Sequence, residues 1–401
     1  MKRMLRLCLA AALFLPLLLC SGCAAPFFFF RPNSSASSQA PVVSRPAASQ
    51  QQPVLSAAPS AVQSDLRYCR QLLSGNELDL YLRVLEAVQN AEPIVTGSSS
   101  DLDTMRRMVD YVRADYPELF WLLGVNSSTI TTVNGVPTEA TIEFRYSEEA
   151  ADLAAAQARV EAAAQECLSG IDPAWSDYDK IKAVYDWVIR RTEYDVEAAD
   201  QSLYTVLVSG RGVCAGYART TQYLLNRLGI PCTYVTGTAR GGAHGWNLVL
   251  ADGDWYYLDP TWGDPLFSDG EKDPDYVSYN YFCVTGEELF QTHTPDDTFP
   301  LPQCTATACN YFARNGLLLD GYDYDTVLDI MRRAVAQRQD ASFRFTSSQA
   351  LAQAVEALTR QYDLLDLVKD ADGGAGILDI STVRHSTNEE LNIFTVYFTF
   401  R

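Results

Sequence analysis

Three residues of this 401-residue chain have the types and spacing of a nucleophilic catalytic site. Cys214 stands just ahead of a stretch with helical pattern, His244 follows 30 residues later, and Asp259 lies 15 residues beyond His244. A thiol that gives its proton to an imidazole can attack a carbonyl carbon, and a carboxylate beside the imidazole fixes its tautomer. The set therefore favours acyl transfer through a thioester. The alternative for a lone cysteine is a small residue of the core.

The elements around His244 predict that it meets Asp259. The pair Asp252-Gly253 in "LVLADGDWYYL" is typical of a two-residue hairpin turn. That turn pairs Ala251 with Asp254 and, by extension, Trp246 with Asp259. Opposed residues share a face of the sheet, so His244 and Asp259 become diagonal neighbours within hydrogen-bonding reach.

The segment after Cys214, "AGYARTTQYLLNRLGIP", has helical spacing and ends at Gly229 before Pro231. Cys214 then lies at a helix N-terminus, where free N–H groups and the helix dipole favour a thiolate. Gly212 and Gly216 leave the backbone beside it open to close approach. The N–H of Cys214 is one expected oxyanion donor, and the sequence does not indicate the other.

The segments "GRGVCAGYA", "HGWNLV" and "WYYLDPTWGDP" resemble the three motifs of the transglutaminase-like superfamily, in the order Cys, His, Asp. The resemblance covers residues 172 to 264. It implies an α+β fold with a papain-like core, Cys214 as nucleophile, His244 as base and Asp259 as the residue that orients it. Gly245, where Ala is usual, and Pro260, where an aliphatic residue is common, depart from the pattern.

Three aromatic residues near the motifs are candidates to line a substrate cleft, and each is equally well explained as core. They are Tyr217, Trp246 and Trp262.

The N-terminus reads as an export signal followed by a tether. Residues 1–22 have a basic start and an apolar stretch, and "CSGC" resembles a lipobox with Cys23 as the lipidated residue, although Cys20 stands where Leu is usual. An ordinary cleaved signal peptide is the alternative. Residues 23–63 are rich in Ser, Ala, Pro and Gln and are expected to be disordered. We therefore expect an extracytoplasmic protein, anchored to the membrane by lipid or else secreted.

Three folded regions are expected beyond the tether. One strand is predicted within the first of them, over 138–147. The regions are a mainly helical region over 64–168, the transglutaminase-like core over 169–290, and a small α+β domain over 300–401.

The bulk composition narrows the partners. Hydrophobic content of 47% and charged content of 20% are globular values, and the formal net charge of −19 disfavours nucleic acid and bare anionic lipid. Protein or peptide substrates, including cell-wall or surface proteins, are expected, and nothing indicates assembly beyond a monomer. No metal or cofactor motif is present. Cys304 and Cys309 are the favoured disulfide pair, with free buried thiols as the alternative.

The sequence thus predicts an extracytoplasmic cysteine acyltransferase of transglutaminase-like type that acts on peptide or glutamine-type amides. A peptidase or amidase with the same triad stays open. So does a surface binding protein that uses the fold as a scaffold, although such a protein has no need to keep all three triad residues.

Overall fold

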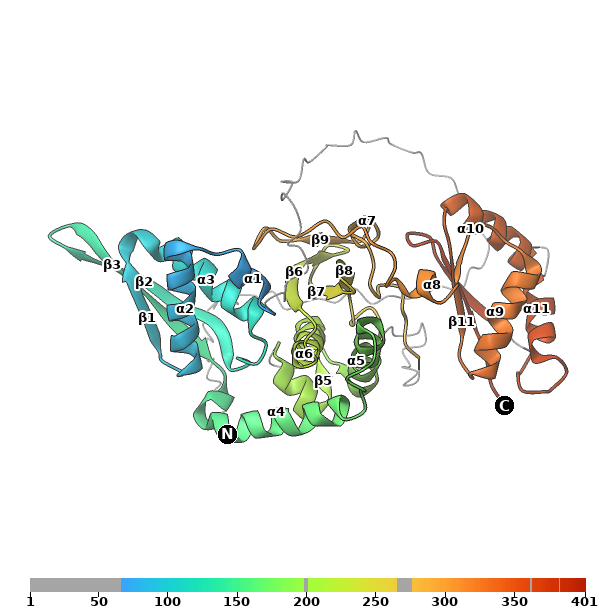
Figure 1. Cartoon of the computed structure of the whole chain (residues 1–401), viewed down its shortest axis with the longest axis horizontal. Coiled ribbons are helices and arrows are strands. Elements are labelled where there is room, and N and C mark those ends of the chain that lie inside the picture. Colours follow the sequence, from blue (N-terminus) through green and yellow to red (C-terminus); the bar gives the residue numbers. More distant parts are fainter. Residues whose placement is uncertain (1–65, 198–200, 265–275, 361–362, 382) are drawn as a thin grey trace, which may run out of the picture.

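A computed structural model describes residues 66–197, 201–264, 276–360, 363–381 and 383–401. The predicted signal, the tether and Cys23 lie outside the described residues. The chain forms three regions in a row, each with helices and strands, which confirms the α+β class (Figure 1). Among the helices in these ranges, none combines the length and the apolar character that crossing a bilayer requires.

The N-terminal region is a three-stranded antiparallel sheet covered by helices, with strand order β1-β3-β2. The strand predicted over 138–147 is present as β3, but two further strands, β1 and β2, were not predicted. The missing signal was Asn134-Gly135, whose positive φ angles of 52° and 79° turn β2 into β3. The elements are α1 (Tyr68–Gln71), α2 (Gly75–Gln89), β1 (Ile94–Ser98), α3 (Leu102–Asp115), β2 (Leu122–Val133) and β3 (Val136–Tyr146).

Helix α4 (Leu153–Leu168) connects this region to the core and lies below the core in the view of Figure 1. Helix α5 (Asp177–Arg191), which follows it, belongs to the core. Ser176 caps α5 by accepting from the backbone N–H of Asp179. The buried face of α5 includes Tyr178 and Tyr185, as its apolar spacing predicts.

The core combines helix α6 with a four-stranded antiparallel sheet of order β8-β7-β6-β9. The Asp252-Gly253 turn has φ angles of 51° and 92°, and Ala251 pairs with Asp254, as the sequence predicts. The elements are β4 (Glu193–Tyr194), a π-helical turn (Thr205–Ser209), β5 (Arg211–Gly212), α6 (Cys214–Arg227), β6 (Cys232–Ala239), β7 (Gly242–Ala251), β8 (Asp254–Leu258), α7 (Gly286–Leu289) and β9 (His293–Pro295).

The C-terminal region packs helices against a second four-stranded sheet, of order β10-β11-β13-β12. Its elements are α8 (Tyr311–Arg314), β10 (Leu318–Leu319), α9 (Tyr324–Ala336), β11 (Ala341–Phe345), α10 (Ser348–Val355), a π-helical turn (Glu356–Arg360), α11 (Asp363–Asp372), β12 (Arg384–Asn388) and β13 (Ile393–Tyr397).

Two large apolar clusters hold the described residues together, and the turn between β12 and β13 reaches from the second to the first. The second cluster begins at Leu319, so residues 300–316 pack with the core. Leu391, in the turn, and Ile393, at the start of β13, also belong to the first cluster, although β12 and β13 are part of the C-terminal sheet. The C-terminal region thus contributes two buried side chains to the first cluster.

Cysteines contribute to these clusters as apolar residues. The seven cysteines in the described ranges are free and buried, so the favoured pairing of Cys304 with Cys309 does not occur. The Sγ atom of Cys304 contacts the carbonyl oxygen of Pro302, whereas that of Cys309 contacts Asp252. The two thiols are packed into different surroundings, which is the alternative of free buried thiols.

Candidate active site

Cys214 is the first residue of helix α6, and the short strand β5 leads the chain into it. Its side chain is buried, with 2% exposed. The first turn of α6 contains no acidic residue, so no carboxylate of that turn opposes the positive end of the helix dipole. The helix terminus favours a thiolate, whereas burial opposes the charged form.

The two glycines beside Cys214 allow the preceding π-helical turn to pack closely. A Cβ atom on Gly212 would lie 2.6 Å from Cγ2 of Val206, and one on Gly216 would lie 2.9 Å from the same methyl group. The open backbone predicted at this point is therefore filled by Val206. The glycines position the start of α6 rather than admit a ligand.

Helix α6 and strand β7 lie side by side and run in the same direction. The Nδ2 atom of Asn247 donates to the carbonyl oxygen of Ala218 over 2.9 Å. Further along, the N–H of Cys232, at the end of β6 that pairs with the last part of β7, donates to Oδ1 of Asn226 over 3.1 Å. The start of the helix, with the nucleophile, therefore lies at the same end as His244.

A second contact joins the start of α6 to the loop that follows Asp259. The hydroxyl of Tyr217, one turn after Cys214, donates to Oδ2 of Asp264 over 2.6 Å. The same hydroxyl lies 3.0 Å from the carbonyl oxygen of Thr192. Two independent contacts thus bring the segments of the predicted nucleophile, base and orienting residue together.

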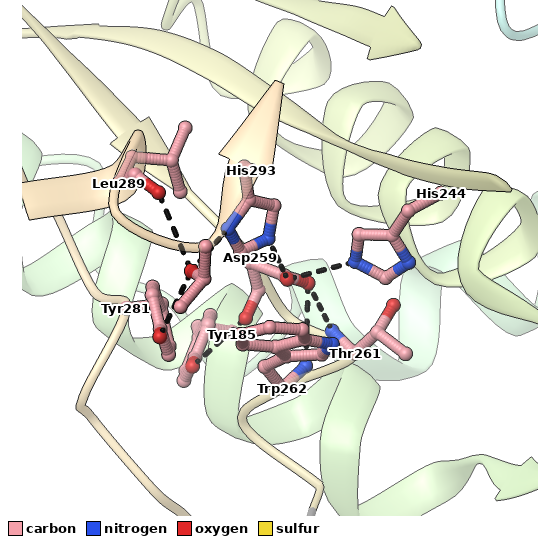
Figure 2. Close-up of polar contacts among 9 residues, drawn as sticks. Tyr185, His244, Asp259, Thr261, Trp262, Tyr281, Leu289 and His293 are labelled. Atoms are coloured by element: carbon pink, nitrogen blue, oxygen red, sulfur yellow. Dashed lines mark hydrogen bonds and ion pairs between the residues drawn. The ribbon is translucent and has the colours of Figure 1, made fainter. Parts of the chain in front are cut away.

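Asp259 is fully buried and receives four hydrogen bonds (Figure 2). Its Oδ1 accepts from the backbone N–H groups of Thr261 and Trp262, over 2.9 and 3.2 Å. Its Oδ2 lies 2.9 Å from Nε2 of His244 and 3.2 Å from Nε2 of His293. The expected neighbourhood of His244 and Asp259 is present, and it includes a second imidazole.

These partners keep Asp259 ionised. Burial alone would raise the pKa of the carboxyl group, but the charge and hydrogen bond of His244 and the hydrogen bond of His293 outweigh it and lower the pKa below its usual range. A charged carboxylate can hold the Nε2–H of His244. Nδ1 is then the ring nitrogen that can exchange a proton with a thiol.

His293 is the site residue that sequence reasoning missed. It lies on the three-residue strand β9, which pairs with β6 by placing His293 opposite Ala239. No catalytic motif surrounds it. The chain has only three histidines, and this scarcity was the available signal. The pairing of a strand as short as β9 depends on tertiary contacts, so the sequence could not place His293 beside Asp259.

The three aromatic candidates differ in exposure. Tyr217 and Trp246 are completely buried, so neither side chain can touch a substrate in this structure. Both are core residues, which is the alternative that the sequence left open. Trp262 is partly exposed, and its ring lies 5.8 Å from that of His244 and 4.4 Å from that of His293. Of the three, Trp262 alone has exposed surface near the site.

His244, Asp259 and His293 also present three donor atoms that all lie within 4.8 Å of one another, a spacing that a metal ion could bridge. Hydrogen bonds account for the same arrangement, because each Nε2 atom faces an ionised carboxylate that needs donors. An ion would have to replace both N–H protons in a buried position.

A cavity of about 600 Å³ lies away from these residues, between the core and the C-terminal region. Its lining includes Arg190, Tyr311, Arg333 and Phe398, and none of the candidate catalytic residues. This cavity therefore does not coincide with the candidate catalytic residues. Asp259 and Cys214 are buried, whereas His244 and Trp262 are partly exposed.

The core has a cysteine at the start of a helix, a histidine on β7 and an aspartate directly after the neighbouring strand β8. This combination is typical of enzymes that use a cysteine nucleophile. Residues 162–260 match the family described as the Transglutaminase-like superfamily. This match confirms the resemblance of the motifs to that superfamily over the matched domain.

Known relatives match over a similar share of the chain. The Kyphoscoliosis peptidases of Mus musculus and Homo sapiens are 28% and 25% identical over 169 residues, which cover 37% of this chain and 26% of each relative. The matched part thus spans about a quarter of their length. The superfamily match supports a cysteine enzyme family.

Two solved structures are similar over about a third of the chain. One is described as a TGase, at 22% identity and a TM-score of 0.24, covering 34% of this chain and 44% of that one. The other, from Cytophaga hutchinsonii, is named a candidate cysteine protease, at 17% identity and a TM-score of 0.23, covering 34% and 61%.

Proposed function

We propose that this chain is an extracytoplasmic enzyme that transfers acyl groups from peptide or glutamine-type amides through a thioester on Cys214. The observation that carries the proposal is the hydrogen bond between His244 and the buried Asp259, beside a helix that begins at Cys214. Burying a carboxylate is unfavourable unless it is well paired. An imidazole held by such a carboxylate, next to a cysteine, is suited to nucleophilic catalysis.

The reaction follows from the assignment of the ring nitrogens. Nδ1 of His244 takes the thiol proton, and the thiolate of Cys214 attacks the amide carbonyl carbon. The tetrahedral intermediate collapses, the C–N bond breaks, and the imidazolium returns its proton to the departing amine. A thioester remains. An amine or water then gives a proton to His244 and attacks the thioester, which releases the thiol.

The acceptor decides between cross-linking and hydrolysis. Hydrolysis is the second candidate, because the Kyphoscoliosis peptidases are named for that activity. Incubation with a fluorescent primary amine and a glutamine-rich protein separates the two. Incorporation of the label means amine transfer, whereas cleavage without incorporation supports a peptidase or amidase. In both cases the expected substrates are proteins or peptides, including surface proteins.

The location is part of the proposal and rests on the N-terminal sequence. Cys23 would carry a lipid that anchors the enzyme outside the membrane. Metabolic labelling with a fatty-acid analogue should mark the wild-type chain and not the C23A variant. Label in neither, with the chain in the medium, would mean a cleaved secreted protein.

The test of the catalytic assignment is the rate at which iodoacetamide alkylates Cys214 as a function of pH. Site-resolved mass spectrometry excludes the six other buried cysteines described. Rapid labelling that persists below about pH 6 and disappears in H244A is expected for a thiolate–imidazolium pair. Labelling that rises only near about pH 8.5 in both proteins would mean an ordinary thiol and a non-catalytic scaffold. A scaffold also predicts ligand capture that C214A leaves intact.

A further inference from the structure

Two imidazoles share one carboxylate oxygen at this site. Oδ2 of Asp259 lies 2.9 Å from Nε2 of His244 and 3.2 Å from Nε2 of His293, while Oδ1 is occupied by two backbone N–H groups (Figure 2). Each carboxylate oxygen can accept about two hydrogen bonds. With His293 in place, every acceptor position of Asp259 is filled by the protein.

The direction of the hydrogen bonds at His293 can be worked out from its other neighbours. Nδ1 of His293 lies 2.9 Å from Oγ1 of Thr292, which lies 3.2 Å from the hydroxyl of Tyr281. If His293 is neutral and donates its Nε2–H to the carboxylate, Nδ1 must accept from Thr292. The Thr292 oxygen is then free to accept from Tyr281. Every hydrogen along this chain has an acceptor.

The carbonyl oxygen of Leu289 is a second acceptor near the Thr292 hydroxyl, 3.3 Å from its Oγ1. It already accepts the backbone N–H of Thr292 over 3.1 Å, so it keeps a partner when the hydroxyl donates to Nδ1 of His293 over the shorter distance of 2.9 Å. An ionised carboxylate can only accept, so Nε2 of His293 is the donor toward Asp259.

From this geometry we infer that His293 is a positioning residue for the proposed reaction. Its Nε2–H holds Oδ2 of Asp259 in the orientation that receives Nε2–H of His244. Nδ1 of His244 is thereby kept toward the thiol. The inference rests on the proposed function, since it concerns the proton that Cys214 gives up. His293 itself is fully buried and touches no substrate.

The imidazole is not needed to hold its own strand. The backbone around β9 is fixed by hydrogen bonds from Arg240 N to Thr292 O and from Asp296 N to Thr236 O, each 2.9 Å long. These bonds are independent of the side chain at position 293. Aromatic rings enclose the imidazole: those of Trp246, Trp262 and Tyr281 lie 5.0, 4.4 and 5.4 Å away. The wild-type imidazole is thus shielded from bulk water.

The test compares two amide replacements in the full-length chain. In His293→Gln, the amide nitrogen falls near the position of Nε2 and can still donate to Asp259. In His293→Asn, the shorter amide reaches the side of Thr292 but not Asp259. The two variants have similar polarity and differ in which neighbour they reach.

We expect His293→Asn to lower kcat by about 10- to 100-fold, as the loss of an outer hydrogen bond does at other sites, with KM changed less than about twofold. Alkylation of Cys214 at pH 6 should slow by a similar factor. His293→Gln should recover both within about threefold. A merely structural role would instead lower both melting temperatures without separating the two variants.

Equal kcat and alkylation in wild type and His293→Asn would overturn the inference, as would losses in both variants that track their melting temperatures. If His293→Asn does not fold, Thr292→Val against Thr292→Ser replaces it, because only serine keeps the hydroxyl that directs Nδ1. An unreactive wild-type Cys214 would instead reject the proposed function, and the inference with it. A reactive wild type that H244A silences and His293→Asn does not would reject the role of His293 alone.

Discussion

The ring of Tyr234 occupies the space into which a side chain at Gly245 would project. A Cβ atom on Gly245 would lie 2.5 Å from Cε2 of Tyr234, closer than such atoms approach in proteins. Tyr234 is itself held in place, with the guanidinium of Arg219 4.2 Å above its ring. The glycine after His244, which departs from the usual alanine, is thus matched to a tyrosine on the neighbouring strand.

Gly245→Ala should lower the free energy of unfolding by about 1–3 kcal/mol, the usual range for overpacking a core. It should also slow alkylation of Cys214, because His244 is the adjacent residue. Thermal and chemical denaturation measure the first effect. Adding Tyr234→Ala makes room for the methyl group, so the double variant should be more stable than the sum of the two changes predicts. Strict additivity would contradict the steric explanation.

Asp259→Asn should lower kcat by about 10²- to 10⁴-fold, because the amide cannot stabilise the His244 imidazolium and can favour the wrong tautomer. The lowered pKa of Asp259 means that its contribution to stability is present above the ordinary pKa and is lost as the pH falls through the folded value. The acid limb of the wild-type kcat profile should therefore not report Asp259. A wild-type limb that Asp259→Asn abolishes near pH 4 would contradict this assignment.

Asp115 predicts the opposite dependence of stability on pH. Burial raises its pKa to about 6 from 3.8, although the hydroxyl of Tyr81 and the N–H groups of Cys69 and Arg70 donate to it. The folded chain therefore binds the proton more tightly than the unfolded chain. The stability gained is full below 3.8 and is lost as the pH rises through 6, a change of about 3 kcal/mol.

Denaturation of wild type and Asp115→Asn at several pH values isolates this contribution from the other carboxyl groups. The stability of wild type relative to the variant should decline between pH 4 and pH 7. A relative stability that is constant, or that increases with pH, would be inconsistent with a raised pKa.

Two ion pairs that join the core to the C-terminal region should differ in strength. Arg344 and Glu288 form a pair whose side chains are 13% and 14% exposed, whereas Arg240 and Glu390 are 39% and 41% exposed. Glu288→Gln keeps an acceptor for the capping box of α7 but leaves a nearly buried guanidinium without its counter-charge. The substitution should lower the free energy of unfolding by at most about 3 kcal/mol. That value is the lower end of the range for fully buried pairs, and this pair is slightly exposed.

Glu390→Gln is the matched control, with an expected cost of about 0.2–1 kcal/mol that shrinks further in high salt. The measurement is the free energy of unfolding from denaturant titration at two salt concentrations. Equal costs for the two variants would mean that exposure does not determine the strength of these contacts.

Much of the catalytic region could be predicted because its signals are local. The Asp252-Gly253 turn defines a register, the register defines a face, and the face brings His244 to Asp259. Asn134-Gly135 carried the same kind of signal for β2 and β3. Local patterns could not show that β9 would pair with β6, and so His293 was not predicted.

Burial was the other quantity that sequence patterns could not supply. The identity of an aromatic residue beside a catalytic motif does not show whether its side chain faces a cleft or the interior. The structure buries Tyr217 against Asp264, buries Trp246 on strand β7, and leaves part of Trp262 accessible. Only the packing of all the surrounding segments determines which side chain remains at the surface.

The crossing of Leu391 and Ile393 into the core cluster limits how this chain can be cut or recombined. A fragment that ends before β12 would lose two buried side chains from the cluster that the N-terminal region and the core share. A relative with a different C-terminal region must fill the same space with other apolar side chains or pack the cluster without them. The first cluster therefore depends in part on side chains of the C-terminal region. Replacing that region alone would remove them from the cluster.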